Sequence, residues 1–137
     1  SPAKKRPMAD RICKELTVHA TIEEEVFYPA VRRAIKDNAL MNEATVEHAS
    51  AKDLIAQIRG MDAGDEMFDA KVVVLGEYID HHVKEERGEM FPLARKTKLD
   101  LVKLAEQLQL RKQALLAEQA PGIKPVPAPV LDVAKVL

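Results

Sequence analysis

The chain is poor in the residues that build disulfide-linked, glycine-rich and membrane-spanning structures. It has a single cysteine, Cys13, no tryptophan and 5 glycines among 137 residues. One cysteine leaves no disulfide framework and no thiolate metal cluster within the chain, which is typical of a reducing compartment. The apolar run Val72–Leu75 is far too short to span a bilayer, and the N-terminus lacks the apolar core of a signal peptide. We therefore expect a cytoplasmic protein with no membrane partner.

An excess of charge of one sign is lacking as well. The chain carries 21 Lys and Arg residues against 22 Asp and Glu residues, a formal net charge of -1. This balance gives no electrostatic reason to expect nucleic acid as a partner. The basic cluster Lys4–Arg6 is short, and we expect it to be a solvated chain end.

The chain does contain apolar residues at helical spacing along most of its length, without strand-like alternation. This spacing predicts four helices, over residues 8–36, 41–59, 66–96 and 100–119. Asp37-Asn38 marks the first break, Gly60 suits the cap that ends the second helix, and Asp100 suits the N-cap of the last. Pro29 lies within the first helix, where the apolar pattern continues beyond it, so we expect a kink rather than a stop. The prediction is an all-α, up-down helical bundle.

The last stretch of the chain differs in composition from the rest. Its prolines, at positions 121, 125, 127 and 129, are incompatible with a helix interior. We expect residues 121–137 to form an extended, Pro-rich C-terminal tail. The helical domain is then predicted to cover residues 1–120.

Two stretches of the chain repeat one pattern of potential metal ligands. In each, a histidine is followed four residues later by a glutamate and ten residues later by a proline. Residues at i and i+4 share one face of a helix, so the imidazole and the carboxylate can bind one metal ion or two adjacent ions. Both pairs fall on the apolar stripe of their helix, where an ionised carboxylate is rarely left without a partner. The candidate ligands are His19 with Glu23 and His82 with Glu86, and packed core histidines are the alternative.

A third histidine, His48, lies in the apolar half of the helix predicted between the two pairs. It has no carboxylate four residues later, because that position is Lys52. We favour a ligand over a packed core histidine, since four other candidate ligands converge on the same bundle core. Aromatic residues near the motifs, including Tyr28, are most simply core, and a hydrogen bond from this phenol to a ligand is the alternative.

The neighbours of these ligands leave choices open. His81 and His82 point about 100° apart on a helix, so only one can face the centre, and the register of the repeats favours His82. Glu85 flanks the stripe, four residues after His81. Glu89 lies on the inner stripe, where a bond to a ligand, weak metal binding and a surface salt bridge all remain open. A solvated face is predicted for two further carboxylates, Glu24 and Glu25.

Imidazole and carboxylate donors without thiolate fit iron, manganese or zinc. Zinc prefers a closed tetrahedral set. Five candidate ligands, with two carboxylates able to bridge, suit a pair of ions with open positions instead. We therefore expect a di-iron site, with zinc or manganese less favoured, that binds O₂ or a related small molecule.

Four runs of the chain, taken together, are similar to a known family: Arg11–His19, Glu23–Pro29, Val46–His48 and His82–Pro92. They resemble a bacterial hemerythrin-like (HHE cation-binding) domain, and the resemblance extends over residues 8–96. It implies a four-helix bundle that holds a non-haem, oxo- or hydroxo-bridged di-iron centre. It also implies a ligand set in which the two glutamates bridge: His19, Glu23, His48, His82 and Glu86.

Two features depart from that family's pattern. Its domain usually begins with a further helix that contributes another histidine, whereas only Ser1–Pro7 precede the first predicted helix here. We expect a truncated form, or a bundle completed by the helix over residues 100–119 or by a second subunit, which makes a homodimer the simplest protein partner. The family's oxygen carriers have a second histidine where this chain has Lys52. Iron binding is therefore expected, but reversible O₂ transport is not.

The leading hypothesis is a di-iron protein that handles O₂, NO or peroxide, or that senses iron or redox state. A different class of function is an interaction module that dimerises and keeps a vestigial metal site. A third is a di-iron peroxidase or oxidase, although the sequence offers no dedicated acid, base or substrate pocket for it.

Overall fold

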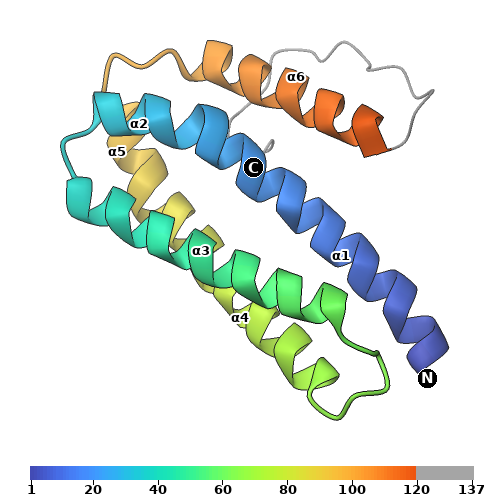
Figure 1. Cartoon of the computed structure of the whole chain (residues 1–137). Helices are drawn as coiled ribbons and strands as arrows, with labels where there is room; N and C mark the ends of the chain where they lie inside the picture. The colour runs from blue at the N-terminus through green and yellow to red at the C-terminus, as the bar shows by residue number, and fades with distance from the viewer. Residues whose placement is uncertain (120–137) are drawn as a thin grey trace.

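The structure, a computed structural model, describes residues 1–119 as four helical rods, and no strand occurs in that range (Figure 1). The first rod consists of α1 (Pro2–Ile22), the π-helical turn η1 (Glu23–Phe27) and α2 (Tyr28–Ala34). The second rod is α3 (Asn38–Gly60). The third consists of α4 (Phe68–Glu85), the π-helical turn η2 (Glu86–Met90) and α5 (Phe91–Arg95), and the fourth is α6 (Leu101–Gln119). The predicted all-α bundle is confirmed, while the predicted tail, residues 121–137, lies outside the described residues.

The helix ends differ from the predicted ones by a few residues, most of all at the N-terminus. The first helix begins at Pro2 rather than near residue 8, since proline fits the first helical turn, where its missing N–H is not needed. Gly60 is the last residue of α3 instead of a cap beyond it. Asp100 is the N-cap of α6, as predicted, because its Oδ1 accepts the backbone N–H of Lys103 at 3.0 Å.

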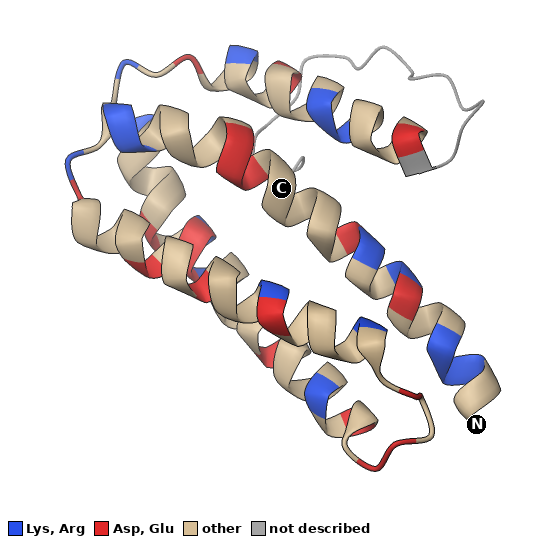
Figure 2. Cartoon of the chain, in the orientation of Figure 1, with Lys and Arg blue, Asp and Glu red and all other residues tan. Residues whose placement is uncertain are grey.

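The basic cluster near the N-terminus is only in part the predicted solvated chain end, because Lys4 is exposed whereas Arg6 is bound to the end of α3. The guanidinium of Arg6 donates to three backbone carbonyls at the end of α3, at distances between 2.7 and 3.1 Å: those of Ile58, Arg59 and Met61. Lys5 forms an ion pair with Asp69 at 2.8 Å. The last carbonyls of a helix have no partner within it, so Arg6 satisfies these groups and its charge opposes the negative end of the helix dipole. Figure 2 shows this basic start of α1 in blue.

The two π-helical turns replace the kink predicted at Pro29. Each begins at the glutamate of one motif, Glu23 or Glu86, and Pro29 or Pro92 lies at the start of the α-helical segment that follows. A proline donates no N–H and its ring collides with the carbonyl four residues earlier. A π turn shifts the hydrogen bonds to the residue five positions back, so the rod continues past the proline instead of ending. The repeated proline thus marks a repeated π turn.

The apolar core consists of two clusters with the motif residues between them along the rods. One contains Phe27, Met90 and Phe91, and the other contains Cys13 and Leu75. The rings of Phe27 and Phe91 meet edge to face, with centroids 5.5 Å apart, and so join the first rod to the third. The polar motif residues are therefore sealed on both sides by packed apolar side chains.

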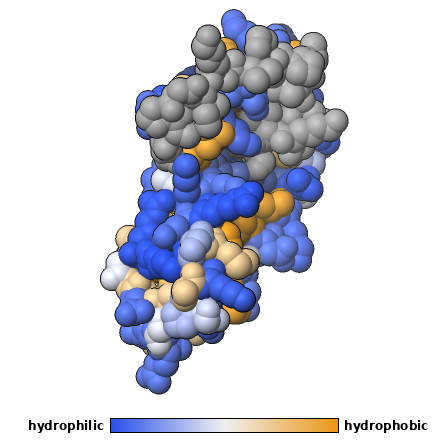
Figure 3. All heavy atoms as spheres, turned by 90° about the vertical axis from the view of Figure 1, so that its right-hand side faces the viewer, coloured by the Kyte–Doolittle hydropathy of each residue, from blue (hydrophilic) through white to orange (hydrophobic). Residues whose placement is uncertain are grey.

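The fourth rod covers one side of the first. α6 packs against α1 and η1, buries Leu104 and Leu108, and forms an ion pair at 2.7 Å between Arg111 and Glu25. In Figure 3, which views the molecule from the right of Figure 1, most of the described atoms in sight are hydrophilic, and apolar atoms show in several separate places. Within residues 1–119, no helix combines the length and apolar character that a bilayer crossing requires.

Candidate metal centre

The five predicted ligands lie together in the middle of the bundle. Glu23 begins η1, His48 lies on α3, His82 lies near the end of α4, and Glu86 begins η2. Each of these four exposes 5% or less of its surface. The fifth, His19, lies one turn before Glu23 on α1, and its side chain is 23% exposed. Three rods therefore bring all five side chains to one place.

His48, His82 and Glu23 form a first cluster. The Nε2 atoms of the two histidines lie 3.2 Å apart, and Glu23 Oε1 lies 3.2 Å from Nε2 of His48 and 3.5 Å from Nε2 of His82. Donor atoms that bind one ion at about 2.0–2.2 Å are separated by about 2.8–3.6 Å when the bond angles lie between a right angle and the tetrahedral angle. The three atoms are therefore spaced as ligands of a single ion.

His19, Glu23 and Glu86 form a second cluster. Nε2 of His19 lies 2.9 Å from Oε1 of Glu23, and one ligand atom from each of the three residues lies within 4.8 Å of the others. Glu23 belongs to both clusters. The arrangement therefore has two adjacent places for a cation, with one carboxylate between them.

The carboxylate of Glu23 lacks the partners that a buried charge needs. It is completely buried, and neither of its oxygens accepts a hydrogen bond, although imidazole nitrogens approach to 2.9 Å. Burial disfavours its ionised form, but the imidazoles of His19, His48 and His82 outweigh burial and hold the pKa of Glu23 well below its usual range. A completely buried carboxylate with three imidazoles around it is typical of a metal ligand, so the donor set fits a cation.

Carboxylates outside this centre hold two of the imidazoles. Nδ1 of His82 lies 3.1 Å from Oε2 of Glu47, and Nδ1 of His48 lies 3.4 Å from Oε1 of Glu24. A carboxylate at Nδ1 favours the tautomer whose Nε2 lone pair is free to face the centre. Glu24 also pairs with Lys52 at 2.5 Å, and its side chain is 35% exposed, so it borders solvent as predicted while it also contacts His48. The role of Glu47 was not predicted, since it depends on a contact between two helices.

The hydroxyl of Tyr28 lies within the centre. It donates to Oε1 of Glu86 at 2.8 Å and lies 2.8 Å from Nε2 of His82 and 3.1 Å from Nε2 of His48. Burial and the carboxylates around it raise the pKa of Tyr28, so the phenol keeps its proton. The structure thus supports the less favoured of the two interpretations, in which this tyrosine contacts the ligands. Phe91, at the equivalent position of the second repeat, has no hydroxyl.

The sequence profile of a family described as Hemerythrin HHE cation binding domain matches residues 1–94. The chain belongs to this hemerythrin HHE family. It is also 32% identical over 94 residues to a protein from Nostoc sp. named DNA nickase. That match covers 69% of this chain and 26% of the relative, so the chain spans about a quarter of the relative's length. No solved structure matches.

Two side chains lie next to the group of five candidate ligands, here called the HHE centre, but do not belong to it. His81 has a 70% exposed side chain and contacts Glu47 and Glu85 at 3.5 and 3.6 Å, so it flanks the helix. Glu89 is exposed, although the helical spacing had placed it on the inner stripe. The reason is η2, because a π turn holds one residue more than an α turn and rotates the side chains within it away from their α-helical directions.

The HHE centre has a small cavity beside it and an open groove next to that cavity. The cavity, about 30 Å³, is lined by His19, His48 and His82 among others and has room for about one water molecule. A groove of about 370 Å³ between α1 and α6 is lined by His19, Ile22 and Leu116 among others. His19 borders both spaces, so its partly exposed side chain lies between the groove and the cavity.

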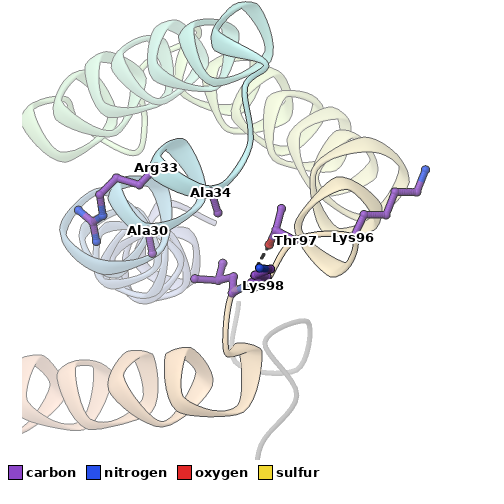
Figure 4. A pocket seen from close by; sticks show the side chains of 7 residues that line it. Ala30, Arg33, Ala34, Lys96, Thr97 and Lys98 are labelled. Carbon is purple, nitrogen blue, oxygen red and sulfur yellow. Dashed lines mark hydrogen bonds between the residues drawn. The ribbon is translucent and has the colours of Figure 1, made fainter.

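A larger hollow lies where α2 and α5 end, away from the HHE centre. It measures about 610 Å³, and the basic residues Arg33, Lys96 and Lys98 contribute to its lining. Figure 4 shows Arg33 and Lys96 extending in opposite directions from it. The hollow therefore does not gather these charges around a common point.

Proposed function

We propose that this HHE domain binds a non-haem di-iron centre and uses it to handle O₂, NO or peroxide, or to sense iron or redox state. The observation that carries the proposal is the completely buried carboxylate of Glu23, shared by two clusters of candidate ligands. The proposed ligands are His19, Glu23, His48, His82 and Glu86. Zinc and manganese accept the same donor types, and they remain the less favoured ions.

The protein's own contribution is to hold the donors and to limit access. Bound iron supplies the capacity to take up small oxygen- or nitrogen-containing molecules and to exchange electrons. Glu47 and Glu24 orient two imidazoles, and Tyr28 supplies a phenol proton among the ligands. The cavity beside the centre admits a molecule about the size of water, which favours a diatomic or peroxide ligand over a larger substrate.

Iron analysis together with a visible spectrum tests this proposal. Protein from iron-rich medium should contain close to two iron atoms per chain, with near-ultraviolet ligand-to-metal bands if the ions are oxo-bridged. A Glu23→Gln variant should lose most of that iron, because its amide cannot serve both clusters. The exposed control Glu106→Gln should keep the iron. A colourless, iron-free protein that is folded by circular dichroism would overturn the proposal.

A dimerising module with a vestigial metal site is the alternative, and the groove between α1 and α6 favours it. That groove is lined by Ile22 and Leu116, and Leu116 is 37% exposed. A homodimer that covers it should scatter light as a particle of roughly twice 15.2 kDa, and Leu116→Glu should return it to a monomer.

We propose no strand-cutting activity for this chain, because the match to the nickase covers only 26% of that protein. A di-iron peroxidase or oxidase would show turnover with peroxide and an electron donor.

A further inference from the structure

A second set of donors lies beside the candidate metal centre and shares none of its five proposed ligands. It consists of Glu47 on α3 with His81 and Glu85 on α4, two helices that pack against each other. Nε2 of His81 lies 3.5 Å from Oε1 of Glu47 and 3.6 Å from Oε2 of Glu85. One ligand atom from each residue lies within 4.8 Å of the others. Figure 2 shows acidic residues, in red, along both segments where they meet.

The carboxylate of Glu85 is largely closed to solvent and faces the exposed imidazole of His81 at 3.6 Å. Both oxygens are closed to solvent and accept no hydrogen bond, and the side chain is only 11% exposed. Two carboxylates that lie this close together, Glu47 and Glu85, with one exposed imidazole beside them, leave negative charge that a cation would offset.

We propose that Glu47, His81 and Glu85 form an outer site for a divalent first-row transition metal ion. One imidazole with two carboxylates suits Zn²⁺, Fe²⁺ or Mn²⁺, whereas Ca²⁺ and Mg²⁺ prefer oxygen donors alone. The exposed imidazole of His81 gives the ion a direct way in from solvent.

Glu47 joins this outer site to the inner centre. Its Oε1 faces His81, while its Oε2 lies 3.1 Å from Nδ1 of His82. An ion in the outer site would therefore be bound by the same carboxylate, that of Glu47, which orients the imidazole of His82. The outer site itself does not depend on the di-iron proposal, because it can fill while the inner ligands are altered.

Equilibrium dialysis of metal-free protein against Zn²⁺ tests the outer site. The double variant His81→Asn/Glu85→Gln should bind one Zn²⁺ fewer per chain than the wild type, whereas the exposed control Glu106→Gln should bind as many. An inner variant, Glu23→Gln/His48→Asn, should still bind one Zn²⁺, so failure of the inner centre is distinguishable from failure of the outer site. Equal binding by the wild type and the outer double variant would overturn the proposal.

A measurement on the wild type keeps the proposal testable if a variant fails to fold. Nitrogen-15 NMR reports which imidazole nitrogens bind a metal, and Zn²⁺ at saturation should shift the His81 ring as well as the inner histidines. Without metal, the double variant should be more stable than the wild type, because only the carboxylate of Glu47 remains of the two that lie together. With Zn²⁺ it should lose part of the stabilisation that the ion gives the wild type. A His81 ring that stays unchanged at saturation would show that the outer residues bind no ion.

Discussion

Replacing Tyr28 by phenylalanine should destabilise the metal-free protein and strengthen its binding of metal. In the structure the hydroxyl donates to Glu86 at 2.8 Å and lies 2.8 Å from an imidazole nitrogen of His82. A hydrogen bond to a charged group contributes about 1.5–3 kcal/mol to stability. The ring itself is tolerated without its hydroxyl, since Phe91 occupies the equivalent position of the second repeat. We expect Tyr28→Phe to lower the free energy of unfolding by about 2 kcal/mol.

The same substitution should cost much less once metal is bound. A bound cation would take up the lone pairs of Glu86, His48 and His82 that the hydroxyl contacts in the structure. The hydroxyl therefore competes with the metal, and removing it no longer sacrifices a strong hydrogen bond. If the loss falls from about 2 kcal/mol to well under 1 kcal/mol, linkage requires roughly tenfold tighter metal binding.

Urea unfolding with and without Zn²⁺, together with a competition titration against a chelator, measures both quantities. Tyr78→Phe is the matched control, because Tyr78 is 43% exposed and the loss of its hydroxyl should change the unfolding free energy by less than about 0.5 kcal/mol. Weaker metal binding by Tyr28→Phe would refute the reasoning. It would mean that the hydroxyl supports the occupied centre rather than the empty one.

The remaining predictions concern the ligand register, the end of α3 and the buried thiol. His82→Ala should remove most of the bound iron, whereas His81→Ala should leave at least half of it, and iron analysis that finds His81→Ala the more damaging would refute the assigned register. Arg6→Ala should lower the free energy of unfolding by about 1–3 kcal/mol in a urea titration, since it leaves carbonyls at the end of α3 unpaired, whereas Arg11→Ala should change it little. Burial raises the pKa of the Cys13 thiol above the ordinary 9.0. Its contribution to stability is therefore fully present below pH 9.0 and is lost as the pH rises through the higher native pKa. The free energy of unfolding of Cys13→Ala should depend less on pH above 9.0 than that of the wild type, and an unchanged pH dependence would contradict this.

The helical rods and the pairing of each motif histidine with its glutamate could be predicted because both follow from spacing along one helix. His19 and Glu23 lie on the same face whatever the rest of the chain does, and the same holds for His82 and Glu86. Which ions these residues bind stays a prediction. The apolar stripe then determines that each pair points inward.

Contacts between rods could not be predicted in the same way. Arg6 reaches carbonyls at the far end of α3, and Glu47 reaches an imidazole on α4. No local pattern encodes either contact, because each depends on how two helices cross. The prediction that Glu89 lies on the inner stripe was wrong for another reason, because the π turn changes the helical period on which that prediction was based. The proline that follows both motifs was the available signal for that turn.

The shared carboxylate makes the two halves of the centre chemically unlike, although a repeated motif builds them. The half with His48 and His82 offers two nitrogen donors and one carboxylate, and the half with His19 and Glu86 offers one nitrogen donor and two carboxylates. Nitrogen-rich sites favour zinc and iron, while oxygen-rich sites accept manganese more readily. If both halves bind ions as proposed, the centre would suit a heterometallic pair as well as two like ions, and the nitrogen-rich half should discriminate more strongly against manganese.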